Sequence, residues 1–160
     1  MVRTQTPVNV YTNASGTFRT QVNSETAART TSVAAPLDRV WAALPEAYGA
    51  LKLPLTMRQD AQHTLGAQNM RLRGEFAGQR LSGYVNCGRG LMGGDAADAY
   101  EVTLAVVSVV SAAADGGTTL QSSVGAIAKP VQTSGDPVQC VSTVRLEGRI
   151  AEQVTVKLSS

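Results

Sequence analysis

Apolar residues recur at intervals of three and four along residues 33–55, VAAPLDRVWAALPEAYGALKLPL. This spacing is typical of one face of an α-helix. Pro36 favours the first turn, because its φ angle is preset and its missing N–H would be unpaired there anyway. The pattern therefore predicts an amphipathic helix over residues 36–51 that covers a sheet. Pro45 lies inside the pattern and predicts a kink or a break into two short helices. The apolar stripe consists of Leu37, Val40, Trp41, Leu44, Tyr48 and Leu51.

The clearest hairpin is predicted over residues 100–114 and 118–129. Asp115, Gly116 and Gly117 separate these two runs, and such residues supply the positive φ angles that tight turns require. Alternating or β-branched patterns predict further strands over residues 26–35, 55–61, 64–76 and 79–87.

A last helix is predicted to follow Ser142 as its cap, because Leu146, Ile150 and Val154 recur every four residues. Residues 154–158 fit a strand as well as a helix. The fold class expected is therefore α+β, an antiparallel β-sheet packed against one or two helices.

The 160 residues are typical in length of one domain. The chain has two Phe, four Tyr and one Trp, so its core is expected to consist of small aliphatic side chains on strands. Residues 1–25 are rich in Thr, Gln, Asn, Ser and Arg, and they are predicted to form an extended polar arm, ordered on a partner or disordered alone. Residues 26–160 are predicted to form a single α+β domain.

The net charge of +2 gives no indication of nucleic-acid binding. Its distribution is uneven, because residues 51–90 carry six basic and two acidic side chains, whereas residues 91–137 carry one basic and five acidic. Two interpretations stay open: strands that pair opposite charges, or a docking surface. Arg71 and Arg73 occupy alternate positions, so they share one face of a strand and either bind carboxylates or phosphates or are simply exposed.

Two cysteines, Cys87 and Cys140, are the right number for one disulfide, which would imply an oxidising compartment. The alternative is a pair of free thiols in a reducing cytoplasm. A metal site is disfavoured, because His63 is the one histidine that could complete it. No run of residues approaches the roughly 20 apolar positions of a membrane span.

The sequence predicts no catalytic residue, metal or cofactor. Gly88, Gly90 and Gly93 match the phosphate-binding pattern GxGxxG, but the residues that follow read as a strand, so a mobile loop is expected. His63 lies in a polar turn without a partner for nucleophilic catalysis. The carboxylates of Asp95, Asp98 and Glu101 are expected to be hydrated, with a loose cation site as the alternative. An enzyme is therefore not expected.

The run VAAPLDRVWAAL, residues 33–44, resembles the strand-to-helix start of helix-grip proteins, the superfamily of pollen-allergen-like and steroidogenic lipid-transfer-like domains. With GALKLPLTMRQDAQHTLG, residues 49–66, the chain looks similar to small exported bacterial proteins and lipoproteins with a helix-grip-like unit, such as component C of the outer-membrane β-barrel assembly machine. The resemblance implies a binding or assembly role outside the cytoplasm. Few aromatic residues and the absence of a cysteine near the N-terminus depart from these patterns.

These observations give two hypotheses of function. The first is a non-enzymatic periplasmic or otherwise extracytoplasmic protein, peripheral to a membrane, that docks on a larger membrane-associated complex, of which a photosynthetic reaction-centre or light-harvesting complex is one case. Its expected partner contacts are Arg3, Tyr11, Phe18, Arg71, Arg73, Arg89, Leu91 and Met92. The alternative is a helix-grip domain that binds a small apolar ligand between the helix at residues 36–51 and the sheet, with a pocket lined by Trp41, Tyr48, Val102 and Leu104.

Overall fold

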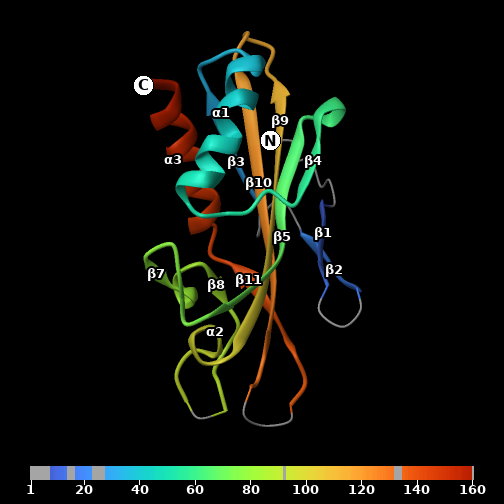
Figure 1. The fold of residues 1–160 in the computed structure, drawn as a ribbon, viewed down its shortest axis with the longest axis vertical. Coiled ribbons are helices and arrows are strands. Elements are labelled where there is room, and N and C mark those ends of the chain that lie inside the picture. Colours follow the sequence, from blue (N-terminus) through green and yellow to red (C-terminus); the bar gives the residue numbers. More distant parts are fainter. Residues whose placement is uncertain (1–7, 14–16, 23–27, 92, 132–134, 160) are drawn as a thin grey trace.

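The computed structural model describes residues 8–13, 17–22, 28–91, 93–131 and 135–159. This part of the chain forms an antiparallel sheet with two long helices on one face and a hairpin on the other (Figure 1). The predicted α+β class is confirmed. In chain order the strands and helices are β1 (Val8–Asn13), β2 (Thr17–Val22), β3 (Ala28–Val33), α1 (Leu37–Ala50), β4 (Met57–Gln59), β5 (Thr64–Arg73), β6 (Glu75–Phe76), β7 (Gln79–Arg80), β8 (Val85–Asn86), α2 (Ala96–Ala99), β9 (Glu101–Ala112), β10 (Thr118–Lys129), β11 (Val138–Ser142) and α3 (Arg145–Ser159).

The β9–β10 hairpin is the centre of the sheet, and its strands pair from Thr118 opposite Ala112 to Lys129 opposite Glu101. The sheet runs in the order β4-β5-β9-β10-β11-β8, and β3 lies on the same edge of β10 as β11. This is possible because the first half of β10 pairs with β3 and its second half pairs with β11. The predicted hairpin at residues 115–117 is thus confirmed.

Helix α1 begins after Pro36, whose carbonyl accepts hydrogen bonds from the N–H groups of Arg39 and Val40. Of the kink or break predicted at Pro45, the break is wrong, because the helix continues through it to Ala50. A proline costs an interior helical position about 3 kcal/mol. Burial of large side chains on either side, Leu44 and Tyr48, contributes a comparable amount, about 1.5–3 kcal/mol each, and offsets that cost.

The predicted strand over residues 79–87 is wrong for most of its length. Residues Leu81–Gly83 form a 3-10 turn between the two-residue strands β7 and β8. Three residues make one turn of a 3-10 helix, so Leu81 and Tyr84 both point into the core, where both are fully buried. The strand predicted over residues 55–61 is likewise shorter, since β4 ends at Gln59 and a 3-10 turn follows.

Helix α3 extends to Ser159, so the strand alternative for residues 154–158 is wrong. The predicted spacing of Leu146, Ile150 and Val154 is confirmed, because all three side chains are buried against the sheet and α1. In the described part of the chain, no helix combines the length and apolar character that a membrane span requires.

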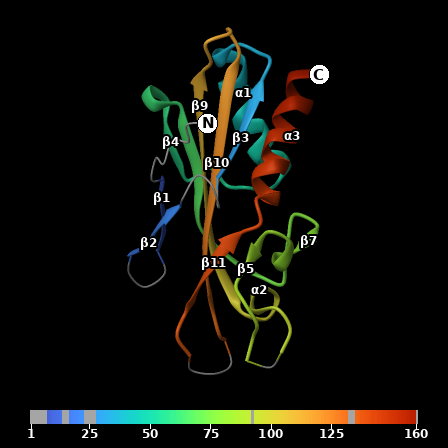
Figure 2. The same cartoon turned by 180° about the vertical axis from the view of Figure 1, so that it is seen from behind.

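The two faces of the sheet bury different kinds of residue. Val102, Leu104 and Val106 of β9 face the helices and belong to the main core, whereas Ala105 and Val107 form a second, smaller cluster. The β1–β2 hairpin lies over this second face, where β1 contacts β5, β9 and β10 (Figures 1 and 2). The segment expected as an extended arm is therefore, in its described part, an antiparallel hairpin.

Gly66 on β5 is expected to be the most sensitive glycine of the sheet. A Cβ atom there would stand 2.5 Å from the carbonyl oxygen of Val106, a backbone atom that cannot turn aside. We expect Gly66→Ala to lower the free energy of unfolding by about 2 kcal/mol, as overpacking does. The matched control is Gly49→Ala in α1, where nothing lies within 4 Å and helix propensity favours alanine. Urea unfolding of both variants tests this, and equal stabilities would contradict it.

Candidate functional site

Cys87 and Cys140 form a disulfide, as predicted. The bond joins the residue after β8 to the middle of β11, across 53 positions of sequence. Both cysteines are largely buried. A disulfide is typical of proteins that mature in oxidising compartments, which fits an extracytoplasmic protein. The bond also fastens the base of a glycine-rich loop, residues 87–95, to the sheet.

This loop and the loop at residues 130–137 lie at the same end of the molecule, the lower end in Figures 1 and 2. We call this region the loop end, and it includes the described residues of both loops and β11. Six large apolar side chains are well exposed in the described chain, and four of them belong to the loop end. These four are Leu91, Val131, Val138 and Val141.

The backbone of the loop holds Leu91 outward. The N–H of Gly90 donates a hydrogen bond to the carbonyl of Gly94, the N–H of Ala96 donates one to the carbonyl of Gly88, and the backbones of Arg89 and Asp95 pair in an isolated antiparallel β-bridge. The N–H of Leu91 donates to the Tyr100 hydroxyl at 3.1 Å. Leu91 is nevertheless 67% exposed, the largest fraction among the exposed apolar side chains. Hydrogen bonds thus hold the described backbone on both sides of Leu91, whose side chain faces solvent.

The strand predicted to follow the GxGxxG match at Gly88, Gly90 and Gly93 is present as β9. A helix of only four residues, α2, follows the loop before β9 begins. The nearby Asp98 carboxylate accepts a hydrogen bond from the N–H of Ser82 at 2.9 Å and so holds the 3-10 turn. In the described ranges, no group of three or more metal-binding side chains gathers around it.

Arg71 and Arg73 are exposed on β5 and share a face, as predicted. Arg73 lies opposite Glu101 on β9, which in turn lies opposite Lys129 on β10. Directly opposite residues on neighbouring strands are close enough for their charges to interact. This alternating row fits the cross-strand interpretation of the uneven charge. Among the other expected contacts, Arg89 is exposed at the loop end.

The remaining expected partner contacts are only partly described. Arg3 and Met92 lie outside the described residues. The backbones of Tyr11 and Phe18 are described, on β1 and β2, where they lie opposite Arg19 and Thr12.

Three of the four residues expected to line a ligand pocket are core residues. Tyr48, Val102 and Leu104 are all fully buried. The Tyr48 hydroxyl shares a hydrogen bond of 2.8 Å with Ser108, and Ser108 shares one of 2.7 Å with Ser122 on the next strand. Burial raises the pKa of Tyr48 above its ordinary value, so the hydroxyl stays protonated. A ligand between α1 and the sheet would have to displace these side chains.

Trp41, the fourth of these residues, lies at the rim of the helix layer. Its ring meets the ring of His63 edge-on at 5.3 Å, and the guanidinium of Arg58 lies 5.1 Å from its centre. Arg58 pairs with Asp60 at 2.8 Å, and this hydrogen bond lowers the pKa of the Asp60 carboxyl. His63 lies at the end of a 3-10 turn, as its polar surroundings predicted, and its backbone is in the left-handed region. Trp41 therefore anchors a surface cluster.

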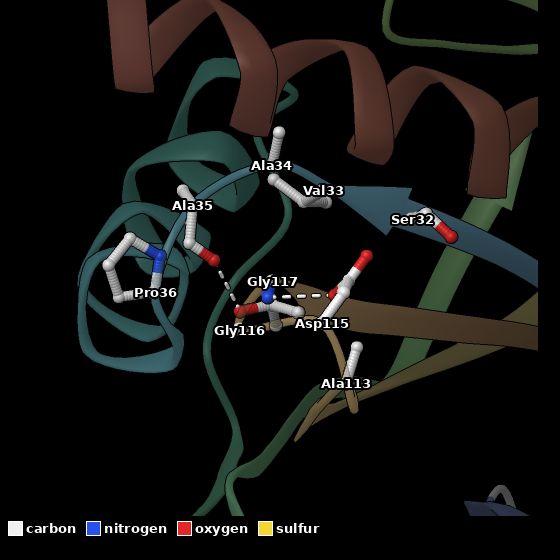
Figure 3. A pocket seen from close by; sticks show the side chains of 10 residues that line it. Ser32, Val33, Ala34, Ala35, Pro36, Ala113, Asp115, Gly116 and Gly117 are labelled. Atoms are coloured by element: carbon white, nitrogen blue, oxygen red, sulfur yellow. Dashed lines mark hydrogen bonds between the residues drawn. The ribbon is translucent and has the colours of Figure 1, made fainter.

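A cavity of about 430 Å³ lies where β3 enters α1, beside the β9–β10 turn (Figure 3). The Thr118 hydroxyl donates to the carbonyl of Ala35 at 2.7 Å, and the N–H of Gly117 donates to the Asp115 carboxylate at 2.9 Å. A Cβ on Gly117 would stand 2.9 Å from the carbonyl oxygen of Val33, so only glycine fits this approach. These contacts join the turn to the helix start and offer little chemistry.

Sequence reasoning missed a buried carboxylate at the start of α3. Glu147 is 1% exposed, its Oε2 accepts a hydrogen bond of 2.6 Å from the Ser142 hydroxyl, and its Oε1 has no partner. Burial raises its pKa to about 7. Ser142 was predicted as the cap of this helix, and its hydroxyl also accepts the N–H of Val144 at 2.9 Å. The sequence did contain a signal for this burial. Glu147 lies three and seven positions before Ile150 and Val154, so it shares their face of the helix.

A scan against protein-family models and a search among curated proteins found no match to this chain.

Proposed function

We propose that this protein is a non-enzymatic extracytoplasmic protein, in the periplasm, that binds a protein partner as an accessory subunit of a membrane-associated complex. The observation that carries the proposal is the loop end. Four of the six well-exposed apolar side chains of the described chain belong to it, and a disulfide joins one of its loops to β11. Large apolar side chains that stay exposed in one region are typical of protein-interaction sites.

The chemistry of the loop end also supports a protein partner. Backbone hydrogen bonds hold the described residues around Leu91, so its exposed side chain can enter a pocket with a smaller loss of conformational entropy. Arg89 adds a cation beside Leu91, and arginine is enriched in protein interfaces. The disulfide supports the compartment, since such bonds persist outside the reducing cytoplasm.

Site-specific photocrosslinking tests this proposal. A photoreactive amino acid replaces either Leu91 or Val156, an exposed valine on α3 that is remote from the loop end. Each tagged variant is added to gently solubilised membranes of the source organism. We expect one defined protein to be crosslinked from position 91 and not from position 156. Equal crosslinking from both positions, or none from position 91, would count against the loop end.

An affinity measurement on the captured partner then gives a magnitude. We expect Leu91→Ser to weaken binding tenfold or more, about 1.4 kcal/mol, as truncation of an apolar anchor does. The matched control, Val156→Ser, removes a similar exposed side chain far from the loop end. We expect it to leave the affinity within about twofold of the original, because residues outside the centre of an interface contribute little to binding.

A further inference from the structure

A second cavity, of about 480 Å³, lies beside the first two turns of α3 and is independent of the loop end. Its walls come from β3, β7, the connection between β11 and α3, and α3 itself. Three of the side chains that line it are arginines, Arg29, Arg145 and Arg149, and one is a carboxylate, Glu152. The cavity therefore gathers an excess of positive charge from two segments far apart in the sequence.

The position of Arg29 depends on a glycine within α3. A Cβ on Gly148 would stand 2.8 Å from Nη1 of Arg29, closer than such atoms approach. Glycine is unfavourable inside a helix, because it loses more backbone entropy than other residues and adds no packing. Here its missing side chain leaves the room in which the Arg29 guanidinium lies against the helix. The local structure thus accommodates a cation at the edge of the cavity.

Arg149 is fixed by different contacts. Its Nη1 donates hydrogen bonds to the carbonyl of Ala77 and to the hydroxyl of Tyr84. Tyr84 is fully buried and belongs to the core, so this arginine is anchored to a rigid element. A preorganised guanidinium loses little conformational entropy when it binds an anion.

The other two arginines, Arg29 and Arg145, are exposed. Within the part of the chain that the structure describes, neither Arg29 nor Arg145 has a carboxylate within 4 Å. Arg29 does act over a longer distance on Glu147, whose pKa it lowers slightly against the larger effect of burial. Val144, which also lines the cavity, has a φ angle of +60°, a strained conformation for a β-branched residue. Such strain is found preferentially at functional sites.

From this geometry we infer that the cavity binds a phosphate monoester group. Guanidinium groups present paired N–H donors that match two oxygens of a phosphate, and hydrogen bonds between charged groups are the strongest of their kind. Three arginines against one glutamate match the double negative charge of a phosphate monoester better than the single charge of a carboxylate. The group belongs either to a soluble phosphate or to a phospholipid headgroup.

The test measures binding of two probes to the full chain. One probe is inorganic phosphate, followed by NMR titration, and the other is a vesicle containing phosphatidic acid, followed by co-sedimentation against neutral vesicles. We expect phosphate to shift the amide signals of residues around Gly148. Saturation by phosphate with no vesicle binding identifies a soluble ligand, whereas vesicle binding that phosphate competes away identifies a lipid headgroup. Absence of binding in both experiments would overturn the inference.

Three variants separate a built site from general positive charge. We expect Arg145→Gln to weaken phosphate binding about tenfold, and Gly148→Ala to weaken it about fivefold without changing the net charge, because its Cβ displaces the Arg29 guanidinium. The control Arg39→Gln removes an exposed arginine on α1, near the far end of α3. An equal loss in the Arg39 variant, or full affinity in both cavity variants, would show that no specific site exists.

Discussion

Replacing Cys87 and Cys140 together by serine is expected to lower the free energy of unfolding by about 4 kcal/mol. The bond closes a loop of 53 positions, and the chain-entropy model assigns a loop of this size about that much stabilisation of the folded state. The effect arises mainly in the unfolded chain, which gains freedom when the link is removed. Since domains of this size are typically stable by only 5–15 kcal/mol, the variant would lose a large part of its stability.

Urea unfolding of the oxidised protein and of the double serine variant measures this difference. The control is dithiothreitol, which should lower the midpoint for the oxidised protein and leave the serine variant unchanged. Hydrogen exchange locates the effect, because the bond holds the loop at residues 87–95 to β11. We expect the serine substitutions to accelerate exchange more at that loop and at β11 than at α1. A stability difference below about 1 kcal/mol would mean that the unfolded chain is already compact there.

The sequence allowed the β9–β10 hairpin and α1 to be predicted because each depends on local chemistry. Asp115-Gly116-Gly117 is a strong turn signal, and the apolar spacing around Leu44 belongs to no other structure. The cysteine pairing was also predictable, because two cysteines allow one partner each. These features required no knowledge of which distant segments meet.

Prediction failed where two patterns share the same residues. An alternating strand would place Leu81 and Val85 on one face and Tyr84 on the other. In the structure all three are buried, because a 3-10 turn brings Leu81 and Tyr84 to the same side. The alternation from residue 79 to 87 therefore indicated the wrong structure. At Pro45, local propensity allowed a break that did not occur, because burial on both sides of the proline favours a continuous helix.

The arginine cavity could not be predicted because its parts are distant in sequence. Arg29 precedes Arg145 and Arg149 by more than a hundred positions, and only the pairing of β3 with β10 brings them together beside α3. One local signal existed, the glycine at position 148 inside a strongly periodic helix. A glycine there indicates that another group approaches the helix closely.

The second large effect is expected from Glu147, whose burial makes stability depend on pH. The folded protein holds the Glu147 proton up to about pH 7, whereas the ordinary pKa is 4.5, so the unfolded chain releases it earlier. Between these values the folded state binds more protons than the unfolded state, and stability falls as the pH rises. The contribution of the Glu147 proton to the free energy of unfolding is fully present below about pH 4.5 and is lost as the pH rises through 7. Since each pKa unit corresponds to 1.36 kcal/mol, the loss is about 3 kcal/mol.

Glu147→Gln removes this titration and is expected to abolish the corresponding slope. The comparison is the difference in unfolding free energy between the original protein and the variant, measured by urea unfolding from pH 4 to pH 8. We expect this difference to move in favour of the variant by about 3 kcal/mol as the pH rises, whatever its value at pH 4. The matched control is Glu46→Gln, which makes the same substitution at an exposed glutamate on α1, outside the arginine cavity.

A constant difference for Glu147→Gln would show that the carboxyl has the same pKa in the folded and the unfolded chain. The Ser142 hydroxyl and Arg29 would then offset the effect of burial, because both favour the ionised form. Glu147 lies next to the glycine that makes room for Arg29, so its charge also acts on the arginine cavity. Retaining the proton there leaves the positive charge of Arg29 less compensated than an ionised neighbour would. The same measurement therefore determines whether the charge of the cavity changes near neutral pH.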